Sequence, residues 1–257
     1  MRPLLPDSNN SSLFFEEMAN CITRHIPNTV TCCNLFCGCV AVVLAYQANY
    51  PAAFLFIILA AVFDFFDGML ARALGAYSPM GKELDSLADD VSFGLAPAMI
   101  VFSLFKEVHV PSFLSAIETW LPYSAFLIAI FSALRLAKFN IDTRQTSSFI
   151  GMPTPANALF WSSLAVGGYE FLISDKFNAI YLVLLVLLTS WLLVAEIPMF
   201  SLKFKNLSWQ SNKVQYIFLL VSLPLIILLK EGCLAAIIIW YAILSLITDY
   251  SQKKHPN

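Results

Sequence analysis

Residues 54–90, FLFIILAAVFDFFDGMLARALGAYSPMGKELDSLADD, decide the fold, because they join two apolar helical segments through one short turn. The first segment is hydrophobic up to residue 63 and then keeps its helical pattern into a charged stretch. A turn signal, Tyr77-Ser78-Pro79, separates it from the second segment. The two segments together hold five aspartates, namely Asp64, Asp67, Asp85, Asp89 and Asp90.

The composition of the whole chain is that of a polytopic membrane protein. Of 257 residues 59% are hydrophobic and 12% are charged, with a mean hydropathy of +0.73, whereas soluble domains carry about 25% charged residues. A helix needs roughly 20 mostly apolar residues to cross the hydrocarbon core. The sequence predicts an all-α bundle of about eight transmembrane helices, at residues 29–48, 52–72, 84–105, 113–137, 156–173, 178–198, 214–230 and 232–249.

The basic residues predict the orientation of this bundle, because Lys and Arg near membrane spans stay on the cytoplasmic side. Twelve of the fifteen fall on one side, leaving Lys106, Lys176 and Lys230 on the other. Both termini are therefore expected in the cytoplasm, with the aspartates on the cytoplasmic side of the cell membrane. The chain lacks basic blocks of the kind that bind nucleic acid, so no nucleic-acid partner is expected.

The chain reads as one helical domain with a polar beginning. Residues 1–25 are expected to form a cytoplasmic tail, with an interfacial helix leading into the first span. The short connections between spans favour antiparallel neighbours in a compact bundle. Four of the six cysteines cluster at residues 32–39, but they form no Cys-x-x-Cys pair and no histidine lies among them, which favours packing over a zinc site.

The spacing of the aspartates predicts a metal site. An aspartate at the centre of a membrane helix costs about 2.5–3.5 kcal/mol on insertion scales, so a structural role explains five of them poorly. Asp64 and Asp67 are three residues apart, and Asp85 and Asp89 are four apart, so each pair shares a helix face. If the turn folds the two helices together, four carboxylates converge and need protons or cations. Oxygen ligands suit Mg²⁺ or Mn²⁺, and a pair of such ions is a known device for phosphoryl transfer.

Small residues on the same helix faces leave room for a ligand. Gly68, Ala71 and Gly81 remove side-chain bulk and would let a nucleotide lie against the helix backbone. Small residues in membrane helices also serve helix packing, so this alternative stays open for Gly68. Asn28 and Thr31 lie near the same face of the first span, where contact with a nucleotide and a hydrogen-bonded helix contact are equally good explanations.

The pattern Asp64-x2-Asp67-Gly68-x2-Ala71-Arg72-x8-Gly81-x3-Asp85-x3-Asp89 resembles the signature of the CDP-alcohol phosphotransferase family at all eight fixed positions. The resemblance implies transfer of a phosphatidyl group from a CDP-activated lipid to an alcohol, with release of CMP. It implies that the first three aspartates bind two metal ions and that Asp89 is the general base. It also implies a CDP pocket at Gly68, Ala71, Arg72 and Gly81, and a homodimer. Asp90 lies outside the signature and is taken as a bystander.

Further stretches are similar to the phosphatidylserine synthase branch of that family. They are residues 26–35 (IPNTVTCCNL), 83–98 (ELDSLADDVSFGLAPA), 134–140 (LRLAKFN) and 149–156 (FIGMPTPA). The resemblance implies CDP-diacylglycerol as donor and L-serine as acceptor. It divides the chain into a tail at 1–25, a catalytic core at 26–205 and two C-terminal transmembrane helices at 206–257.

Serine is a zwitterion, so its site needs a cation for the carboxylate. Arg135, Lys138 and Arg144 lie at the cytoplasmic end of the fourth predicted span and are the candidates. Positive-inside anchoring is the alternative for Lys138 and Arg144. Lys138 stands where the family more often has arginine, which keeps the charge but loses a bidentate fork.

Two other functions remain open on the sequence alone. A sibling enzyme that uses glycerol phosphate or inositol phosphate would also place basic residues near its site. A cation transporter would carry intramembrane carboxylates too, but spread along a pore. The carboxylates here gather beside two glycines and Arg72 near one surface, which favours catalysis.

Overall fold

The computed structural model describes residues 8–142, 149–200, 208–209 and 212–254, and the side chains of residues 25–142, 150–200, 208–209 and 212–249 within them. The elements in chain order are the helices α1 (Ser8–Tyr46), α2 (Tyr50–Ala73), α3 (Pro79–Asp89), the π-helix η1 (Asp90–Leu95), α4 (Ala96–Leu104), the 3₁₀ helices η2 (Ser112–Ile117) and η3 (Leu121–Phe126), α5 (Leu127–Ile141), strand β1 (Phe149–Ile150), α6 (Thr154–Gly167), α7 (Tyr169–Leu172), α8 (Ala179–Val194), strand β2 (Pro198–Met199), α9 (Lys213–Leu229), the 3₁₀ turn η4 (Lys230–Gly232) and α10 (Cys233–Lys254).

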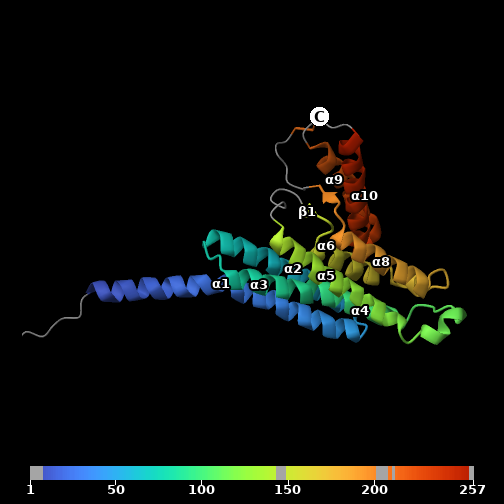
Figure 1. Cartoon of the computed structure of the whole chain (residues 1–257), viewed down its shortest axis with the longest axis horizontal. Coiled ribbons are helices and arrows are strands. Elements are labelled where there is room, and N and C mark those ends of the chain that lie inside the picture. The colour runs from blue at the N-terminus through green and yellow to red at the C-terminus, as the bar shows by residue number, and fades with distance from the viewer. Residues whose placement is uncertain (1–7, 143–148, 201–207, 210–211, 255–257) are drawn as a thin grey trace, which may run out of the picture.

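The prediction of an all-α membrane bundle is confirmed. Most of the helices run along one long axis, and the first part of α1 projects beyond the others (Figure 1). Five helical segments are long and apolar enough to cross a membrane, and they span His25–Tyr46, Tyr50–Ala73, Pro79–Leu104, Leu121–Ile141 and Lys213–Asp249. The last contains both α9 and α10, while α6 and α8 are shorter, at 14 and 16 residues. The expected count of eight spans is not confirmed by these lengths.

Helix α2 and its turn fold as the sequence predicts, for local reasons. The Asn49 side chain accepts a hydrogen bond from the Ala52 backbone N–H at the start of α2. After α2 the chain turns at Gly75, whose φ of +60° lies in the left-handed region that glycine adopts without strain. Ser78 then caps α3, because its Oγ accepts the Gly81 N–H at 2.9 Å. The cap and the glycine return the chain in the opposite direction, so that α2 and α3 face each other.

Helices α1 and α2 pack closely because their contact faces carry small side chains. Ala41, Ala45, Ala53 and Ala60 are all fully buried, together with Ile57. Small residues let membrane helices approach each other, where dispersion contacts replace the hydrophobic effect. This contact fixes the C-terminal part of α1 against the part of α2 that precedes Asp64.

The third predicted span contains a π-helical turn directly after Asp89. The segment Pro79–Leu104 is continuous, but η1 widens it over six residues. Ser92 in η1 donates a hydrogen bond to the Asn34 carbonyl of α1 at 3.1 Å, and Gly94 lies close to Ser132 of α5. Such π turns are frequent at functional sites because they redirect the side chains around them.

The fourth predicted span, residues 113–137, is wrong at its beginning. Two 3₁₀ helices, η2 and η3, occupy residues 112–126, and the α-helix begins only at Leu127. Pro111 precedes η2 and Pro122 lies in the first turn of η3. Proline lacks a backbone N–H and restricts the residue before it, which breaks up regular α-helix here.

A hydrogen-bonded group ties the helices together at the end of the bundle away from the aspartates. The Tyr50 hydroxyl donates to one Glu107 carboxylate oxygen at 2.6 Å, and the Tyr169 hydroxyl donates to the other at 2.5 Å. Hydrogen bonds to a charged group are worth about 1.5–3 kcal/mol each. They hold the start of α2, the end of α4 and α7 in one arrangement.

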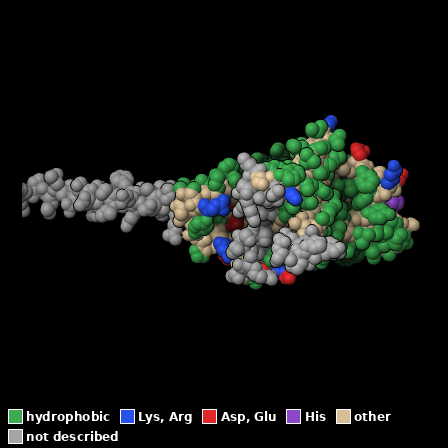
Figure 2. Space-filling view, turned by 90° about the horizontal axis from the view of Figure 1, so that it is seen from above, with side chains coloured by type: hydrophobic (Ala, Val, Ile, Leu, Met, Phe, Trp, Pro, Cys, Tyr) green, Lys and Arg blue, Asp and Glu red, His purple; other side chains and the backbone are tan. Residues whose placement is uncertain are grey.

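The C-terminal hairpin of α9 and α10 is anchored to α6. An added Cβ on Gly167 would collide with the Gly232 backbone, so only glycine permits this approach. The Ser163 Oγ donates to the Glu231 carbonyl at 2.7 Å and accepts the Ala235 N–H at 3.1 Å. Much of α9 beyond this anchor is exposed and apolar. Figure 2 shows a face that is largely hydrophobic, with charged side chains in small groups, as a lipid-facing protein requires.

Candidate active site

Helices α2 and α3 bring the predicted aspartates together. Asp64, Asp67 and Asp85 each offer a carboxylate oxygen, and these three oxygens lie within 4.8 Å of one another. Asp89 lies close enough to Asp64 and Asp85 for the charges of these carboxylates to repel one another. The side chains of Asp67 and Asp89 are only 6% and 9% exposed. The convergence of four carboxylates, expected from the spacing, is thus present in the fold.

Neighbouring side chains hold these carboxylates without neutralising them. The Asn34 Nδ2 donates to Asp89 Oδ1 at 3.2 Å, whereas the Thr31 hydroxyl, which lines the cavity with Asp67, donates to the Pro27 carbonyl at 3.1 Å. Asp67 Oδ2 and Asp85 Oδ1 are buried with no hydrogen-bond partner among the described residues. No Lys or Arg in the described part of the chain forms a salt bridge to the cluster. Buried carboxylates this close repel one another unless cations or protons intervene.

The cluster therefore fits a divalent metal. Its ligand atoms are carboxylate oxygens alone, which hard cations such as Mg²⁺ and Mn²⁺ prefer. The buried, unpartnered oxygens of Asp67 and Asp85 are free to coordinate an ion. A structural aspartate network would instead satisfy these oxygens internally.

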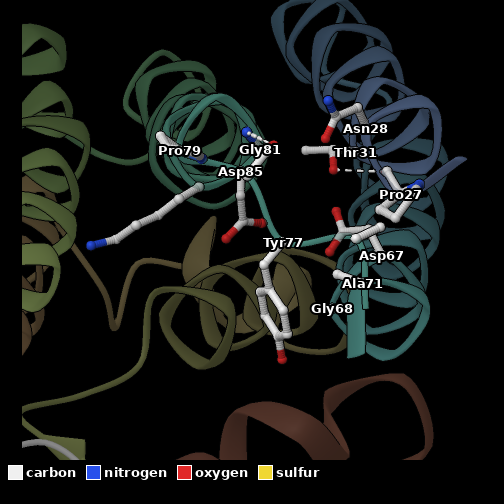
Figure 3. A pocket seen from close by; sticks show the side chains of 13 residues that line it. Pro27, Asn28, Thr31, Asp67, Gly68, Ala71, Tyr77, Pro79, Gly81 and Asp85 are labelled. Atoms are coloured by element: carbon white, nitrogen blue, oxygen red, sulfur yellow. Dashed lines mark hydrogen bonds between the residues drawn. The ribbon is translucent and has the colours of Figure 1, made fainter. Parts of the chain in front are cut away.

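A cavity of about 500 Å³ opens beside the carboxylates (Figure 3). Ligand pockets for small molecules commonly measure about 300–1,000 Å³. The cavity is lined by Pro27, Asn28, Thr31, Asp67, Gly68, Ala71, Ala76, Tyr77, Ser78, Pro79, Gly81, Lys82 and Asp85. Five of the six residues predicted for CDP binding are in this set. The sixth, Arg72, directs its guanidinium to within 3.7 Å of the position where a Cβ on Gly68 would lie.

Gly81 shows why the signature needs glycine at this position. A Cβ added there would lie 2.9 Å from Asn28 Oδ1 and 3.0 Å from Ser78 Oγ. A methyl group would push aside the Asn28 amide, which lines the cavity, or the Ser78 hydroxyl that caps α3. The absence of a side chain at Gly81 thus leaves the Asn28 amide in the cavity wall and the Ser78 cap undisturbed.

Sequence reasoning missed the lining residues contributed by the loop between α2 and α3. Ala76, Tyr77 and Ser78 carry no helical periodicity that could have placed them. The one feature of the sequence that indicated them was the gap of eight residues between Arg72 and Gly81, because so short a connection must lie close to both helices and therefore to the cavity. Lys82 was counted only as a cytoplasmic charge, but it also lines the cavity and donates to the Asn140 carbonyl at 3.0 Å.

The three residues predicted for serine lie in different surroundings. Arg135 is 7% exposed, and its Nη1 donates to Thr154 Oγ1 at 3.3 Å. Its Nε has no partner among the described residues, and its charge is attracted to that of Asp89. Lys138 forms an exposed salt bridge with Glu196 at 3.1 Å. Arg144 lies outside the described residues.

Asp90 lies apart from the three aspartates with converging oxygens. Its Oδ1 is buried and would lie 2.7 Å from a Cβ on Gly94, which in turn lies against Ser132 of α5. The carboxylate therefore faces α5, in a direction different from that of Asp85 and Asp89.

Comparison with known proteins agrees with this geometry. A family model described as CDP-alcohol phosphatidyltransferase matches residues 24–248. The chain is 43% identical over 136 residues to the CDP-diacylglycerol–serine O-phosphatidyltransferase of Bacillus subtilis, covering 51% of this chain and 70% of that protein. It is 33% identical to the protein of the same name from Mycobacterium leprae, covering 68% of this chain and 57% of that protein. For the Helicobacter pylori protein of that name the identity is 31%, covering 78% of this chain and 80% of that protein.

The family match extends over most of the chain and includes the clustered aspartates, the cavity beside them, α9 and most of α10. The resemblance inferred from the signature is confirmed. This chain belongs to the CDP-alcohol phosphatidyltransferase family.

Proposed function

We propose that the protein transfers the phosphatidyl group of CDP-diacylglycerol to L-serine, giving phosphatidylserine and CMP. The observation that carries this proposal is the cluster of buried carboxylates opening onto a cavity of nucleotide size. The names of the relatives supply the donor and the acceptor. CDP-diacylglycerol, L-serine and CMP are the substrates and product that must pass through this site.

The reaction is an in-line displacement at the phosphorus that bears diacylglycerol. The serine hydroxyl oxygen forms the new bond to this phosphorus, while the bond to the bridging oxygen of CMP breaks and CMP leaves with the electron pair. Asp89 accepts the hydroxyl proton. The hydrogen bond from Asn34 to Asp89 Oδ1 orients the carboxylate and leaves Oδ2 for the proton.

Asp64, Asp67 and Asp85 are proposed to hold Mg²⁺ or Mn²⁺ as a two-metal centre, with Asp89 as a further ligand. When bound, these ions neutralise the diphosphate of the donor and the phosphate of departing CMP. Gly68, Ala71, Arg72, Gly81, Asn28 and Thr31 are proposed to bind the CDP portion. Five of these six line the cavity, and Arg72 brings a positive charge close to it.

The proposed topology places the site at the cytoplasmic face of the cell membrane, with about eight spans and both termini in the cytoplasm. Support comes from the basic residues Arg72, Lys82 and Lys138 at the cavity end of the bundle. Lys106 lies at the other end, over the Tyr46 and Phe102 rings. We retain the division into a tail at 1–25, a core at 26–205 and two C-terminal helices at 206–257. A homodimer is proposed from the family alone.

The acceptor can be identified by measuring CMP release from CDP-diacylglycerol. Purified protein in detergent with Mg²⁺ or Mn²⁺ is offered L-serine, glycerol 3-phosphate or inositol phosphate in parallel. We expect release with serine alone, and none after EDTA. CMP release with glycerol 3-phosphate or inositol phosphate instead of serine would be consistent with the family but would show that the acceptor is not serine. If the folded protein releases CMP with none of these acceptors, the transferase activity is contradicted, and a cation transporter becomes the better explanation.

Arg135 is the best-supported contact for the serine carboxylate, because it is buried beside Asp89 with one nitrogen unpartnered. Arg135→Lys keeps the charge but loses the bidentate fork. We expect the KM for serine to rise about 10- to 100-fold, which corresponds to one or two charge-assisted hydrogen bonds, while the KM for CDP-diacylglycerol changes little.

Lys138→Gln is the companion variant for this measurement. Lys138 and Arg144 are also proposed to attract serine, but Lys138 is exposed and paired with Glu196. Its removal should therefore raise the KM for serine only a few-fold. An unchanged KM for serine in folded Arg135→Lys protein would remove Arg135 from the acceptor site.

A further inference from the structure

The loop between α2 and α3 brings an aromatic ring to the cavity. Tyr77 lines the cavity, yet 69% of the residue is exposed. In the view of Figure 3 its ring extends between the side of the cavity that carries Asp85 and the side that carries Gly68. A large flat side chain is thus available at the cavity without being packed into the protein.

The backbone on both sides of Tyr77 is fixed. The Ala76 N–H donates to the Ala71 carbonyl at 3.0 Å, which closes the C-terminal end of α2 after Gly75. On the other side Ser78 caps α3 through the Gly81 N–H. The Tyr77 ring is therefore presented from an ordered position one residue before α3, and its side-chain torsions alone decide how far it reaches over the cavity.

The cavity wall combines carboxylates with polar and apolar residues. Asp67 and Asp85 supply its negative charge, where the diphosphate of the donor would approach through bound cations. The apolar members of the wall include Pro27, Ala76 and Pro79. A nucleobase has a flat apolar face and a polar edge, and it suits such a wall, whereas the acyl chains of the donor must remain in lipid.

We propose that the Tyr77 ring stacks on the cytosine base of CDP-diacylglycerol and of CMP. This role rests on the proposed function and adds a binding residue to it. Every base has a π-face, so stacking on an aromatic ring contributes affinity without selecting among bases. It stabilises the nucleotide equally before and after the phosphorus–oxygen bond breaks. Tyr77 therefore sets the affinity for the donor and for CMP rather than the rate of the chemical step.

Three variants test this role, namely Tyr77→Ala, Tyr77→Phe and Met80→Ala. Met80 is a matched control, because it is 70% exposed, lies three residues further along and does not line the cavity. With Tyr77→Ala we expect the KM for CDP-diacylglycerol and the inhibition constant of CMP to rise together by about tenfold or more, with kcat within about twofold. Tyr77→Phe retains the ring, so its KM for CDP-diacylglycerol and its inhibition constant for CMP should stay close to those of the unmodified protein. Met80→Ala should also leave both constants unchanged.

Calorimetric titration of CMP in the presence of Mn²⁺ provides a readout that needs no acceptor. Weaker CMP binding in Tyr77→Ala, restored in Tyr77→Phe, supports stacking. Unchanged CMP affinity in Tyr77→Ala would overturn the stacking role without contradicting the transferase activity. A loss of CMP affinity in Met80→Ala as large as that in Tyr77→Ala would overturn it too. If the unmodified protein binds CMP but releases none from its donor with any acceptor, the proposed function fails and the stacking role is judged on CMP affinity alone.

Discussion

Asp89→Asn is expected to lower kcat for serine-dependent CMP release by about 10²- to 10⁴-fold, the usual contribution of a positioned general base. Asparagine has nearly the same shape, but its amide cannot accept the proton of the serine hydroxyl. The native carboxylate is almost fully buried and held by Asn34, so solvent cannot easily replace it. Initial rates at saturating donor and serine measure the loss.

Asp90→Asn is the matched control for this variant, because it makes the same chemical change at the adjacent position. The Asp90 carboxylate faces Gly94 and α5 instead of the other carboxylates, so kcat should change less than about threefold. Mn²⁺ binding by Asp89→Asn must be measured alongside, since Asp89 is also a proposed ligand. Retention of a tenth or more of the native rate would exclude Asp89 as the base.

The carboxylate cluster could be predicted from sequence because charge inside apolar helices has few explanations. The spacings of Asp64 with Asp67, and of Asp85 with Asp89, fix a helix face, and one short turn leaves little freedom in how the two faces meet. The cavity beside them followed for the same reason, since small residues at fixed spacing on those helices must line whatever space the faces enclose.

Features that depend on distant residues could not be predicted in this way. Lys138 pairs with Glu196 across 58 positions of the chain, and Arg135 bonds Thr154 across 19. Neither partner is marked by a local pattern. The π turn after Asp89 likewise has no periodicity signal.

The 3₁₀ segments before α5 illustrate a different limit. Hydropathy treated residues 113–137 as one span because their average composition is apolar, although Pro111 and Pro122 were visible in the sequence. A window that averages hydropathy gives no weight to a missing backbone N–H. At this boundary Pro111 and Pro122 determine where the α-helix begins more than the average composition does.

Asp64→Asn is expected to reduce kcat/KM by about 10³-fold or more, because loss of a metal ligand removes several kcal/mol of charge stabilisation from the transition state. Asp64 contributes one of the three converging oxygens and lies close enough to Asp85 and Asp89 for their charges to interact. Removing its charge should weaken the binding of the metal ion proposed for this cluster. Mn²⁺ titration followed by electron paramagnetic resonance measures this directly and should show weaker binding or fewer ions per chain.

Asp175→Asn provides the control, because Asp175 is an exposed aspartate in the connection between α7 and α8, outside the residues that line the cavity. It should bind Mn²⁺ and turn over substrate like the unmodified protein. Unchanged Mn²⁺ binding in Asp64→Asn would contradict the metal assignment even if activity fell. Weaker Mn²⁺ binding that excess Mn²⁺ overcomes, with turnover partly restored, would instead show that the Asp64 carboxylate acts through the metal, since a group acting directly on serine could not be rescued by added ion.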